Sequence, residues 1–503
     1  MRQLIRILPA LLFAASCLAT DLTGNWVAET PADDGTVRKA YFNLKQQDSR
    51  ITGSIRVTQF YYTISESTGA PEKFTITGSM KDGSTGRHIV YEGKLIGDEL
   101  HLATRRRPDE PLVEMIARRA PDGEGAMPAR IPPPSLHKIS DNGLVRIPPM
   151  GWNSWNNFKG RVDDAVIRQI ADAMISSGMK DAGYQYVNID DTWEGSRDAN
   201  GNILANQKFP DMKALAEYVH SRGLKLGIYS SPGPNTCAGY EGSYAHEEQD
   251  AHTYAAWGID YLKYDWCGAR NLYSDDEMQA VYQKMGDALQ ASGRAIAYSL
   301  CQYGRDDVWK WGADVGGNLW RTTGDIRDAW ESMSKIGFSQ SDLAQWAKPG
   351  HWNDPDMLEI GNGAMSDTEY KTHMSLWSIL AAPLLAGNDL RNMSASIHDI
   401  LTNREVIAVN QDKEGKQGKR FSQSGSQEIW VRDLAGGAKA VGLFNRADTD
   451  AEISTTWTDL GFTGNPKKLR VRDLWTHQSL DTPGERYSAN VPGHGVVLLR
   501  IQK

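Results

Sequence analysis

From Pro148 to about Gln411, the chain alternates between short apolar segments and amphipathic segments, and this alternation strongly constrains its fold. Apolar residues three to four apart indicate helices at Val166–Gly178, Met212–Arg222, Glu277–Ser292 and Asp367–Leu380. The apolar segments have the length of buried strands and are Met150–Trp155, Tyr184–Asp191, Lys225–Ser230, Ile259–Asp265, Ala295–Cys301, Leu319–Asp325, Trp352–Met357 and Pro383–Leu390. Eight strands alternating with helices over about 260 residues predict a (β/α)₈ barrel in residues 148–411. A doubly wound open sheet is the alternative, but no glycine-rich phosphate loop follows the first strand.

The residues on either side of this barrel have a β-type pattern instead. Residues 21–120 contain short alternating runs punctuated by Gly, Asp and Ser, which predict a small antiparallel barrel or sandwich. Its expected strands are Asn25–Ala28, Ala40–Leu44, Ile51–Val57, Phe74–Gly78, Ile89–Leu95, Leu100–Thr104 and Val113–Arg118. Residues 121–147 are rich in Pro and Gly and predict a stiff linker. Alternation returns in residues 412–503, which we expect to form a C-terminal antiparallel β-sandwich.

The N-terminus has the pattern of a secretory signal peptide. In residues 1–19, Arg2 and Arg6 precede a short apolar run that ends in small residues, so we expect export to the periplasm, the surface or the medium. Cys17 follows small residues, and lipid anchoring through it is an alternative, although the usual leucine three positions earlier is missing. No other segment is apolar and long enough to span a membrane.

Composition narrows the possible partners. The net charge of -8 argues against a nucleic-acid partner, which would favour a basic surface. The 16 Trp and 19 Tyr outnumber the 10 Phe, and their flat faces with a polar edge suit sugars, although aromatic cores use them too. Because export permits disulfides, one disulfide and one free thiol is the simplest pairing of Cys237, Cys267 and Cys301.

Polar residues end most of the predicted barrel strands, where barrel enzymes keep their active sites. The most informative segment ends at Asp265, with Lys263 two residues earlier and therefore on the same side of the strand. A cation beside a carboxylate favours its ionised form, although a purely structural buried ion pair is the alternative. The other strand-end residues are Trp152, Asp190, Asp191, Tyr229, Gln302, Arg321, Asp325, Asp354 and Asp356.

This set of side chains suits a neutral, polyhydroxylated substrate, and it predicts neither a metal nor another cofactor, since no metal-ligand spacing or phosphate loop is present. Hydrolysis of a glycoside needs two carboxyl groups. We predict that Asp265 is the nucleophile and that Asp325, at the end of the sixth strand, is the acid/base. For that role the pKa of Asp325 must be raised, by burial or by the charge of Asp265. Asp325 as the N-cap of the following helix is an equally open alternative.

Asp190 and Asp191 are adjacent, so both reach the site only if the strand ends and the backbone turns before them. We expect them to bind sugar hydroxyls, and a calcium site is the alternative. Of Asp354 and Asp356, one is expected to bind sugar and the other to hold the loop. Trp152 and Tyr229 could each face the sugar or belong to the core.

Several segments of the sequence resemble those of a known family. The segments "PPMGWNSWNNF", "KDAGYQYVNIDDTW", "YLKYDWC", "WRTTGDI", "GHWNDPDMLEIGNG" and "APLLAGNDLR" are similar to glycoside hydrolase family 27, the retaining α-galactosidases and α-N-acetylgalactosaminidases. The likeness runs from about Pro148 to the C-terminus and does not cover residues 1–147. It implies hydrolysis of terminal α-linked D-galactose by double displacement, with an α-galactoside oligosaccharide or polysaccharide as the substrate.

The resemblance also implies individual roles. Asp265 matches the nucleophile and Asp325 the acid/base, whose carboxyl groups should lie about 5–5.5 Å apart. Cys237 and Cys267 match a disulfide pair, which leaves Cys301 as a buried thiol. The positions that match sugar-binding residues are Trp152, Asp190, Asp191, Tyr229, Lys263, Arg321 and Asp356.

Two departures from the family pattern concern the site. A second disulfide is lost, because both of its usual positions, near Gly160 and Thr192, lack cysteine. The common "CEWG" after the fifth strand is "CQYG" here, so Gln302 replaces a glutamate that lies near the sugar's 2-substituent. An amide can still bind a 2-hydroxyl, and we therefore favour galactose. The alternatives are the same chemistry on α-N-acetylgalactosamine, β-L-arabinopyranose or isomaltodextran, or a non-catalytic sugar-binding protein. The oligomeric state is not predicted.

Overall fold

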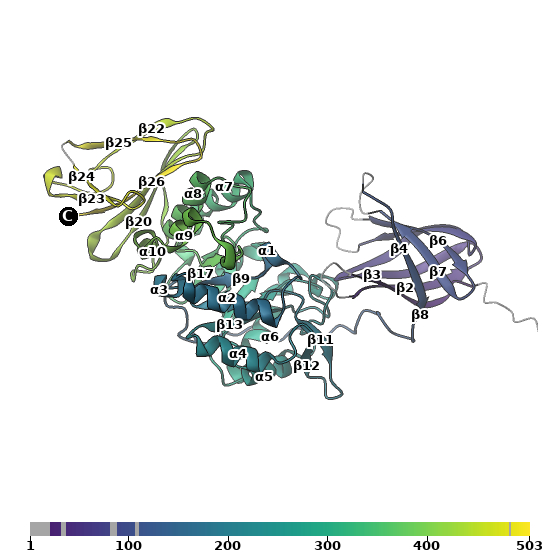
Figure 1. Cartoon of the computed structure of the whole chain (residues 1–503). Coiled ribbons are helices and arrows are strands. Elements are labelled where there is room, and N and C mark those ends of the chain that lie inside the picture. The colour runs from purple at the N-terminus through teal and green to yellow at the C-terminus, as the bar shows by residue number, and fades with distance from the viewer. Residues whose placement is uncertain (1–20, 32–36, 81–87, 106–109, 482–483) are drawn as a thin grey trace, which may run out of the picture. The chain divides into compact units, whose positions relative to one another are not determined.

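The computed structural model describes residues 21–31, 37–80, 88–105, 110–481 and 484–503 (Figure 1). The chain divides into two compact units, with the boundary between Pro128 and Ala129. The predicted signal peptide, residues 1–19, and Cys17 lie outside the described residues. Within the described ranges, no helix combines the length and apolarity needed to cross a membrane.

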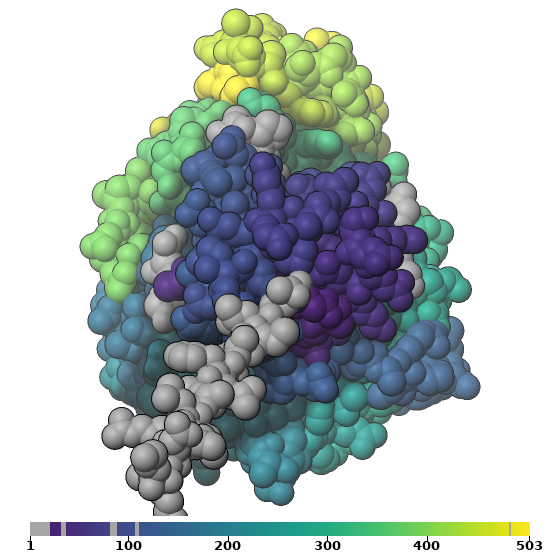
Figure 2. Space-filling view, turned by 90° about the vertical axis from the view of Figure 1, so that its right-hand side faces the viewer, coloured from purple at the N-terminus to yellow at the C-terminus, as the bar shows by residue number. Residues whose placement is uncertain are grey.

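The first unit is a closed barrel of antiparallel strands that follow one another in chain order, and the last strand pairs with the first. The strands are β1 (Gly24–Pro31), β2 (Val37–Gln47), β3 (Arg50–Val57), β4 (Phe60–Ala70), β5 (Lys73–Ser79), β6 (His88–Ile96), β7 (Glu99–Thr104) and β8 (Val113–Arg119). Alternate side chains, among them Trp26, Phe42, Ile76 and Leu100, fill its interior. Figure 2 shows the surface of this unit in purple and blue.

The sequence pattern misses β4, because the strand does not alternate regularly. Tyr61 and Tyr62 are both buried, and the register with β5 shifts between Ile64 and Glu66. Such an irregularity displaces the side chains that follow it, so the period of two is lost. The expected antiparallel N-terminal β-domain is confirmed, and it is a barrel rather than a sandwich.

The predicted (β/α)₈ barrel forms the core of the second unit. Its parallel strands are β9 (Met150–Asn153), β10 (Tyr186–Asn188), β13 (Lys225–Ser230), β14 (Tyr261–Asp265), β15 (Ala297–Cys301), β16 (Leu319–Arg321), β17 (Trp352–Asp354) and β18 (Leu384–Ala386). They lie side by side in chain order, and β18 pairs with β9. A parallel bridge between Leu358 and Ala386 joins the segment after β17 to β18 and closes the ring.

Helices lie around these strands (Figure 1), in the connections between them and, for the last two, after β18. They are α1 (Trp155–Phe158), α2 (Asp164–Ser176), α3 (Met179–Ala182), α4 (Met212–Ser221), α5 (Glu247–Trp257), α6 (Met278–Ala291), α7 (Trp330–Phe338), α8 (Asp367–Ile379), α9 (Ala395–Thr402) and α10 (Arg404–Asn410). A hairpin of β11 (Glu194–Arg197) and β12 (Ile203–Ala205) follows β10. The side chains of Asp163, Asp211 and Ser366 accept hydrogen bonds from the first turns of α2, α4 and α8, and this fixes where these helices start.

Short 3₁₀ turns complete the connections of the second unit, at η1 (Ala269–Asn271), η2 (Asp275–Glu277), η3 (Arg305–Lys310), η4 (Gln340–Trp346), η5 (Leu390–Asn392), η6 (Ala435–Gly437) and η7 (Pro466–Lys468). The second half of the predicted linker also belongs to this unit. The amide of Ile139 donates to the carbonyl of Asp314, and Trp352 Nε1 donates to the carbonyl of Val145. Leu144 and Val145 pack against the first residues of several barrel strands, so this segment covers the amino-terminal end of the ring.

The C-terminal residues form two antiparallel sheets with a shared apolar core. One sheet contains β19 (Lys419–Ser424), β20 (Gln427–Asp433), β21 (Lys439–Asn445), β26 (Val496–Gln502), β23 (Arg470–Asp473) and β24 (Gln478–Leu480), and the other contains β22 (Ala451–Thr456) and β25 (Arg486–Val491). Arg432 Nη1 donates to the carbonyl of Ser378 at the end of α8, which ties this sandwich to the barrel. The predicted C-terminal β-sandwich is therefore confirmed.

Candidate active site

The adjacent pair Asp190 and Asp191 lies beyond the end of β10, whose last paired residue is Asn188. Both are almost fully buried. Asp190 Oδ2 accepts hydrogen bonds from Lys263 Nζ at 2.8 Å and from Asn153 Nδ2 at 2.8 Å. The ammonium of Lys263 is thus paired directly with Asp190 rather than with Asp265.

Asp191 is anchored by a loop on the neighbouring strand connection. Its Oδ2 accepts a hydrogen bond from the amide of Ala238 at 2.7 Å, while its buried Oδ1 accepts none within the described part of the chain. Burial, assisted by the charges of Asp190 and Asp265, raises the pKa of Asp191 to about 7. A buried acceptor without a donor is costly, so this oxygen is suited to a ligand hydroxyl.

Asp265 ends β14 and is 5% exposed. The hydroxyl of Tyr303 donates to its Oδ1 at 2.6 Å. Burial raises the pKa of Asp265 to about 6, against the lowering effects of the Lys263 charge and the Tyr303 hydrogen bond. Lys263 therefore favours the ionised form as expected, but its effect does not outweigh burial.

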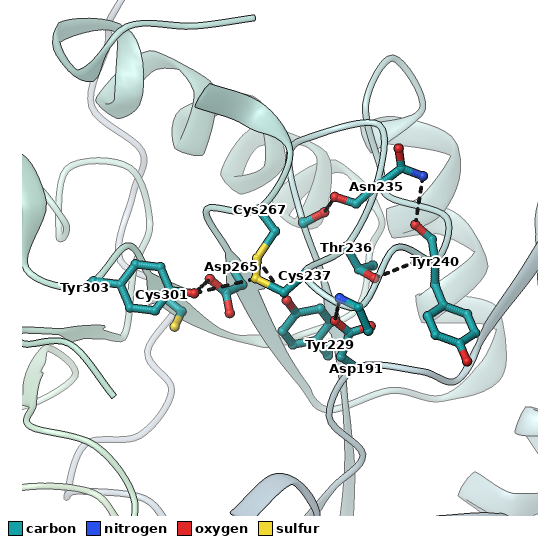
Figure 3. Close-up of a disulfide and its surroundings, with 12 residues drawn as sticks. Asp191, Tyr229, Asn235, Thr236, Cys237, Tyr240, Asp265, Cys267, Cys301 and Tyr303 are labelled. Atoms are coloured by element: carbon teal, nitrogen blue, oxygen red, sulfur yellow. Dashed lines mark hydrogen bonds between the residues drawn. A yellow bond between two sulfur atoms is a disulfide. The ribbon is translucent and has the colours of Figure 1, made fainter. Parts of the chain in front are cut away.

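The loop after β14 is tied to the loop after β13 by the disulfide between Cys237 and Cys267, whereas Cys301 is a buried free thiol. Figure 3 shows Asp265 between the ring of Tyr303 and this disulfide. Among the described residues, one cluster of three possible metal ligands is close enough to bind an ion, namely Cys237, Asp265 and Cys267. Because its two sulfurs form the disulfide, this cluster is not a metal site.

Asp325 differs from its predicted placement. Strand β16 ends at Arg321, so Asp325 lies in the loop four residues later instead of ending the strand. It is not a helix N-cap either, since α7 begins at Trp330 with Ala329 as its cap. Arg321 Nη2 donates to Asp325 Oδ1 at 3.1 Å and also to the carbonyl of Thr323, which holds the loop.

The charge balance of Asp325 also differs from the expectation. Its side chain is 71% exposed. The protein atoms around this exposed carboxyl desolvate it in part and push its pKa up, but the positive charges of Arg321 and Lys263 outweigh this, and the pKa of Asp325 lies below its usual value. In the ligand-free protein a proton therefore binds to Asp265 more readily than to Asp325, the reverse of the order required for attack.

Asp356 makes the contacts of a loop-holding residue. Its Oδ2 forms an ion pair with Arg321 Nη2 at 2.7 Å and accepts a hydrogen bond from the amide of Ile326 at 2.9 Å. Its Oδ1 accepts a hydrogen bond from the amide of Met357. Its backbone φ is +106°, an unusual conformation for a residue with a Cβ atom. Asp354, at the end of β17, accepts a hydrogen bond from the amide of Asp356 and supports the backbone conformation of that residue.

The remaining predicted site residues are buried, like Asp190, Asp191 and Asp265. Trp152 is fully buried, with its Nε1 donating to the carbonyl of Asn388. Tyr229 is buried with its hydroxyl 3.5 Å from Cys267 Sγ, and Lys263 Nζ lies 5.3 Å from the centre of its ring. Gln302 Nε2 donates to the carbonyl of Arg321, whereas its buried Oε1 has no hydrogen-bond donor among the described residues.

Among the groups that the sequence pattern missed are two that contact Asp265 and Asp191. One is the hydroxyl of Tyr303, and the only sequence signal was its position directly after Gln302. The other is the amide of Ala238, which carries no side-chain signal at all. Both reach the site from loops, and their directions depend on the backbone of those loops.

Buried carboxylates at the carboxyl end of a (β/α)₈ barrel, together with polar acceptors that lack donors, define the class of barrel hydrolases that bind polyhydroxylated substrates. Comparisons with known proteins are more specific. Residues 147–412 match the family described as alpha galactosidase A, and residues 424–501 match the alpha galactosidase C-terminal beta sandwich domain.

Individual relatives agree. The chain is 48% identical to alpha-galactosidase 2 of Arabidopsis thaliana over 369 residues, which cover 73% of this chain and 92% of the relative. Alpha-galactosidase I of Mortierella vinacea has a similar solved structure, with a TM-score of 0.69 and 37% identity over 72% of this chain and 99% of that one. A Bacteroides fragilis protein provisionally assigned as an alpha-galactosidase/melibiase has a TM-score of 0.69 and 30% identity, and the match covers 96% of this chain and 99% of that one.

The chain therefore belongs to the α-galactosidase family, glycoside hydrolase family 27.

Proposed function

We propose that this α-galactosidase releases terminal α-D-galactose by a retaining double displacement in which Asp265 is the nucleophile and Asp325 the acid/base. Membership of the family makes the chain a glycoside hydrolase that acts on α-galactosides. The assignment of Asp265 is supported by its place at the end of β14, inside a buried cluster of polar groups. The exposed side chain of Asp325 supports a role at the edge of that cluster, where a leaving group departs.

In the first step, Asp265 Oδ2 bonds to the anomeric carbon while the bond to the leaving oxygen breaks. The electron pair of that bond goes to the leaving oxygen, which takes the proton of Asp325. In the second step, water attacks the anomeric carbon and gives a proton to Asp325. The bond to Oδ2 breaks as the water attacks, its electron pair returns to Asp265, and both groups regain their starting states.

This sequence needs Asp265 ionised and Asp325 protonated, whereas the free protein favours the opposite order. We propose that substrate binding reverses the order. A sugar placed over the exposed Asp325 removes water from it, and desolvation raises the pKa of a carboxyl group. A hydrogen bond from a sugar hydroxyl to Asp265 would favour the ionised form of this carboxyl group at the same time.

The observation that carries the sugar-binding proposal is the pair of buried acceptors for which the described part of the chain supplies no donor, Asp191 Oδ1 and Gln302 Oε1. We propose that galactose hydroxyls donate to both, with Gln302 at the 2-hydroxyl. Asp190 and Lys263 form a buried pair that can accept from and donate to neighbouring hydroxyls. Further contacts are proposed for Trp152, Tyr229, Arg321 and Asp356, of which Asp356 acts chiefly by holding Arg321 and the loop.

We also propose a physiological substrate and a location for the enzyme. We propose that the substrate is an oligosaccharide or polysaccharide that ends in α-galactose. Export through the N-terminal signal would place the enzyme outside the cytoplasm, where such substrates occur, and anchoring through Cys17 is the alternative.

Initial rates on p-nitrophenyl glycosides test this function. We expect fast release from the α-D-galactoside, and slow release from the α-N-acetylgalactosaminide, the β-L-arabinopyranoside and the α-glucoside. Asp265→Asn should abolish turnover while keeping galactose binding, and Asp459→Asn, at an exposed position, is the matched control. Comparable or faster rates on another sugar would contradict the galactose assignment, and wild-type turnover in Asp265→Asn would contradict the nucleophile.

A further inference from the structure

Tyr303 lies against the proposed nucleophile, although the family pattern that led to the other site residues has tryptophan at this position. Its hydroxyl donates to Asp265 Oδ1 at 2.6 Å, as Figure 3 shows. The residue belongs to the loop that follows β15, so a group from one strand connection reaches the end of the neighbouring strand. The contact is therefore a property of this loop's conformation rather than of β14.

The backbone at this point is unusual. Tyr303 has a φ of +64° and Gly304 a φ of +75°, two consecutive residues in the left-handed region. A residue with a Cβ atom rarely adopts that conformation unless its surroundings impose it, and such residues concentrate at functional sites. A Cβ atom on Gly304 would lie 2.2 Å from the carbonyl oxygen of Thr322, so the turn also packs closely on the loop that carries Asp325.

The side chain of Tyr303 is held on both sides. The guanidinium carbon of Arg321 lies 5.9 Å from the centre of its ring, and Cys237 Sγ of the disulfide lies 3.7 Å from its hydroxyl. Burial and the nearby charge of Asp265 raise the pKa of Tyr303 well above its usual value. The hydroxyl therefore keeps its proton and acts toward Asp265 only as a donor.

We propose that Tyr303 is a positioning residue for the nucleophile: its hydroxyl holds Asp265 Oδ1, so that Oδ2 faces the anomeric carbon, and it stabilises the carboxylate that leaves in the second step. This proposal rests on the proposed role of Asp265. When Oδ2 bonds to the sugar, Oδ1 becomes the carbonyl oxygen of an ester and loses charge. When water displaces Asp265, the electron pair returns to the carboxylate, and the hydrogen bond from Tyr303 strengthens as that charge develops.

The two steps therefore depend differently on the hydroxyl. Tyr303→Phe should slow the second step by roughly 10- to 100-fold, the usual effect of a hydrogen bond to an ionised group. With p-nitrophenyl α-galactoside, kcat and KM should fall together, because the covalent intermediate accumulates, and a burst of nitrophenol should precede the steady state. The alkaline limb of kcat/KM should also move upward by about 1 to 2 pH units, because Asp265 loses a donor that favours its ionised form and therefore keeps its proton to a higher pH.

Tyr298→Phe is the matched control, since Tyr298 is a buried tyrosine on β15 whose hydroxyl donates to the carbonyl of Tyr282, away from the site. It should change neither the pH profile nor the ratio of kcat to KM. Tyr303→Trp, which restores the common family residue but has no hydroxyl, should show the same upward shift of the alkaline limb as Tyr303→Phe.

Two results in Tyr303→Phe would overturn the proposal. One is an unchanged alkaline limb together with unchanged kcat and KM. The other is a lower kcat with unchanged KM, no burst and an unmoved alkaline limb, which would indicate a purely structural role. A failure of the proposed function is recognised separately, because Asp265→Asn would then retain turnover whatever Tyr303→Phe does.

Discussion

Replacing Asp191 with asparagine should make the protein more stable while it weakens sugar binding. Asp191 is almost fully buried, and its pKa is raised from 3.8 to about 7 chiefly by that burial. The pKa of Asp191 is higher in the folded protein than in the unfolded protein. The contribution of this group to stability is therefore fully present below its unfolded pKa and is lost as pH rises through its folded pKa. The shift of about 3 units corresponds to a penalty of about 4 kcal/mol above pH 7, since one unit is about 1.4 kcal/mol.

Asparagine carries no charge and therefore removes this penalty. At pH 5, where Asp191 is largely protonated in the folded protein, the same linkage gives a penalty of about 2 kcal/mol. We expect the gain in unfolding free energy to be larger at pH 8 than at pH 5 by about 2 kcal/mol. The amide oxygen of the introduced asparagine can still accept a hydrogen bond from the amide of Ala238, so the loop contact is kept.

Denaturant unfolding followed by tryptophan fluorescence, at pH 5 and at pH 8, measures this difference. Asp459→Asn serves as the exposed control and should change stability little at either pH. The affinity for galactose should fall by roughly 10- to 100-fold, because a charged acceptor is lost. Equal gains at the two pH values, or a loss of stability at pH 8, would refute the argument that buried charge at Asp191 is kept for function.

Other predictions concern catalysis. Above pH about 6, kcat/KM should fall about tenfold per unit, because the reacting form needs one proton on the pair Asp265 and Asp325 and the free protein loses that proton from Asp265, whose pKa burial raises to about 6; a profile that stays flat from pH 6 to pH 8 would contradict this. Asp325→Ala should lower kcat on galactosides with poor leaving groups by roughly 100- to 10,000-fold, but far less on activated aryl galactosides, and azide should restore turnover by forming a galactosyl azide. An equal loss on both kinds of substrate would argue against an acid/base role. Cys237→Ser removes the disulfide that ties the loop of Ala238 to Cys267, so KM should rise by about tenfold with a smaller change in kcat. An unchanged KM would show that the loop holds Asp191 without the disulfide.

The sequence predicted the architecture well, because the helix and strand periods of the barrel are regular. The bounds predicted for α4 and α8 differ from those observed by a single residue at one end. Strand β4 escaped because an irregular register hides its period. The predicted strand Lys225–Ser230 coincides with β13, but the other predicted barrel strands were too long, since an apolar run extends beyond the residues whose backbone pairs.

That last error explains the misplacement of Asp325. Its alternation with Arg321 suggested one continuous strand, but the backbone leaves the sheet after Arg321. Within-strand alternation also placed Lys263 beside Asp265, whereas its direct partner, Asp190, comes from a different strand end. Tyr303 could not be found in this way, because its contact with Asp265 depends on a left-handed loop conformation that no periodicity encodes.

Trapping the covalent intermediate tests the central claim most directly. A 5-fluoro-α-D-galactosyl fluoride has a leaving group that needs no acid, and its ring fluorine slows the second step by destabilising the positive charge of the transition state. After reaction, proteolysis and mass spectrometry locate the sugar on the chain. The account predicts one fluorogalactosyl group per chain, on the peptide that contains Asp265, and none in Asp265→Asn. A label on another carboxylate, or steady hydrolysis of the reagent with no label at all, would contradict the proposed double displacement through Asp265.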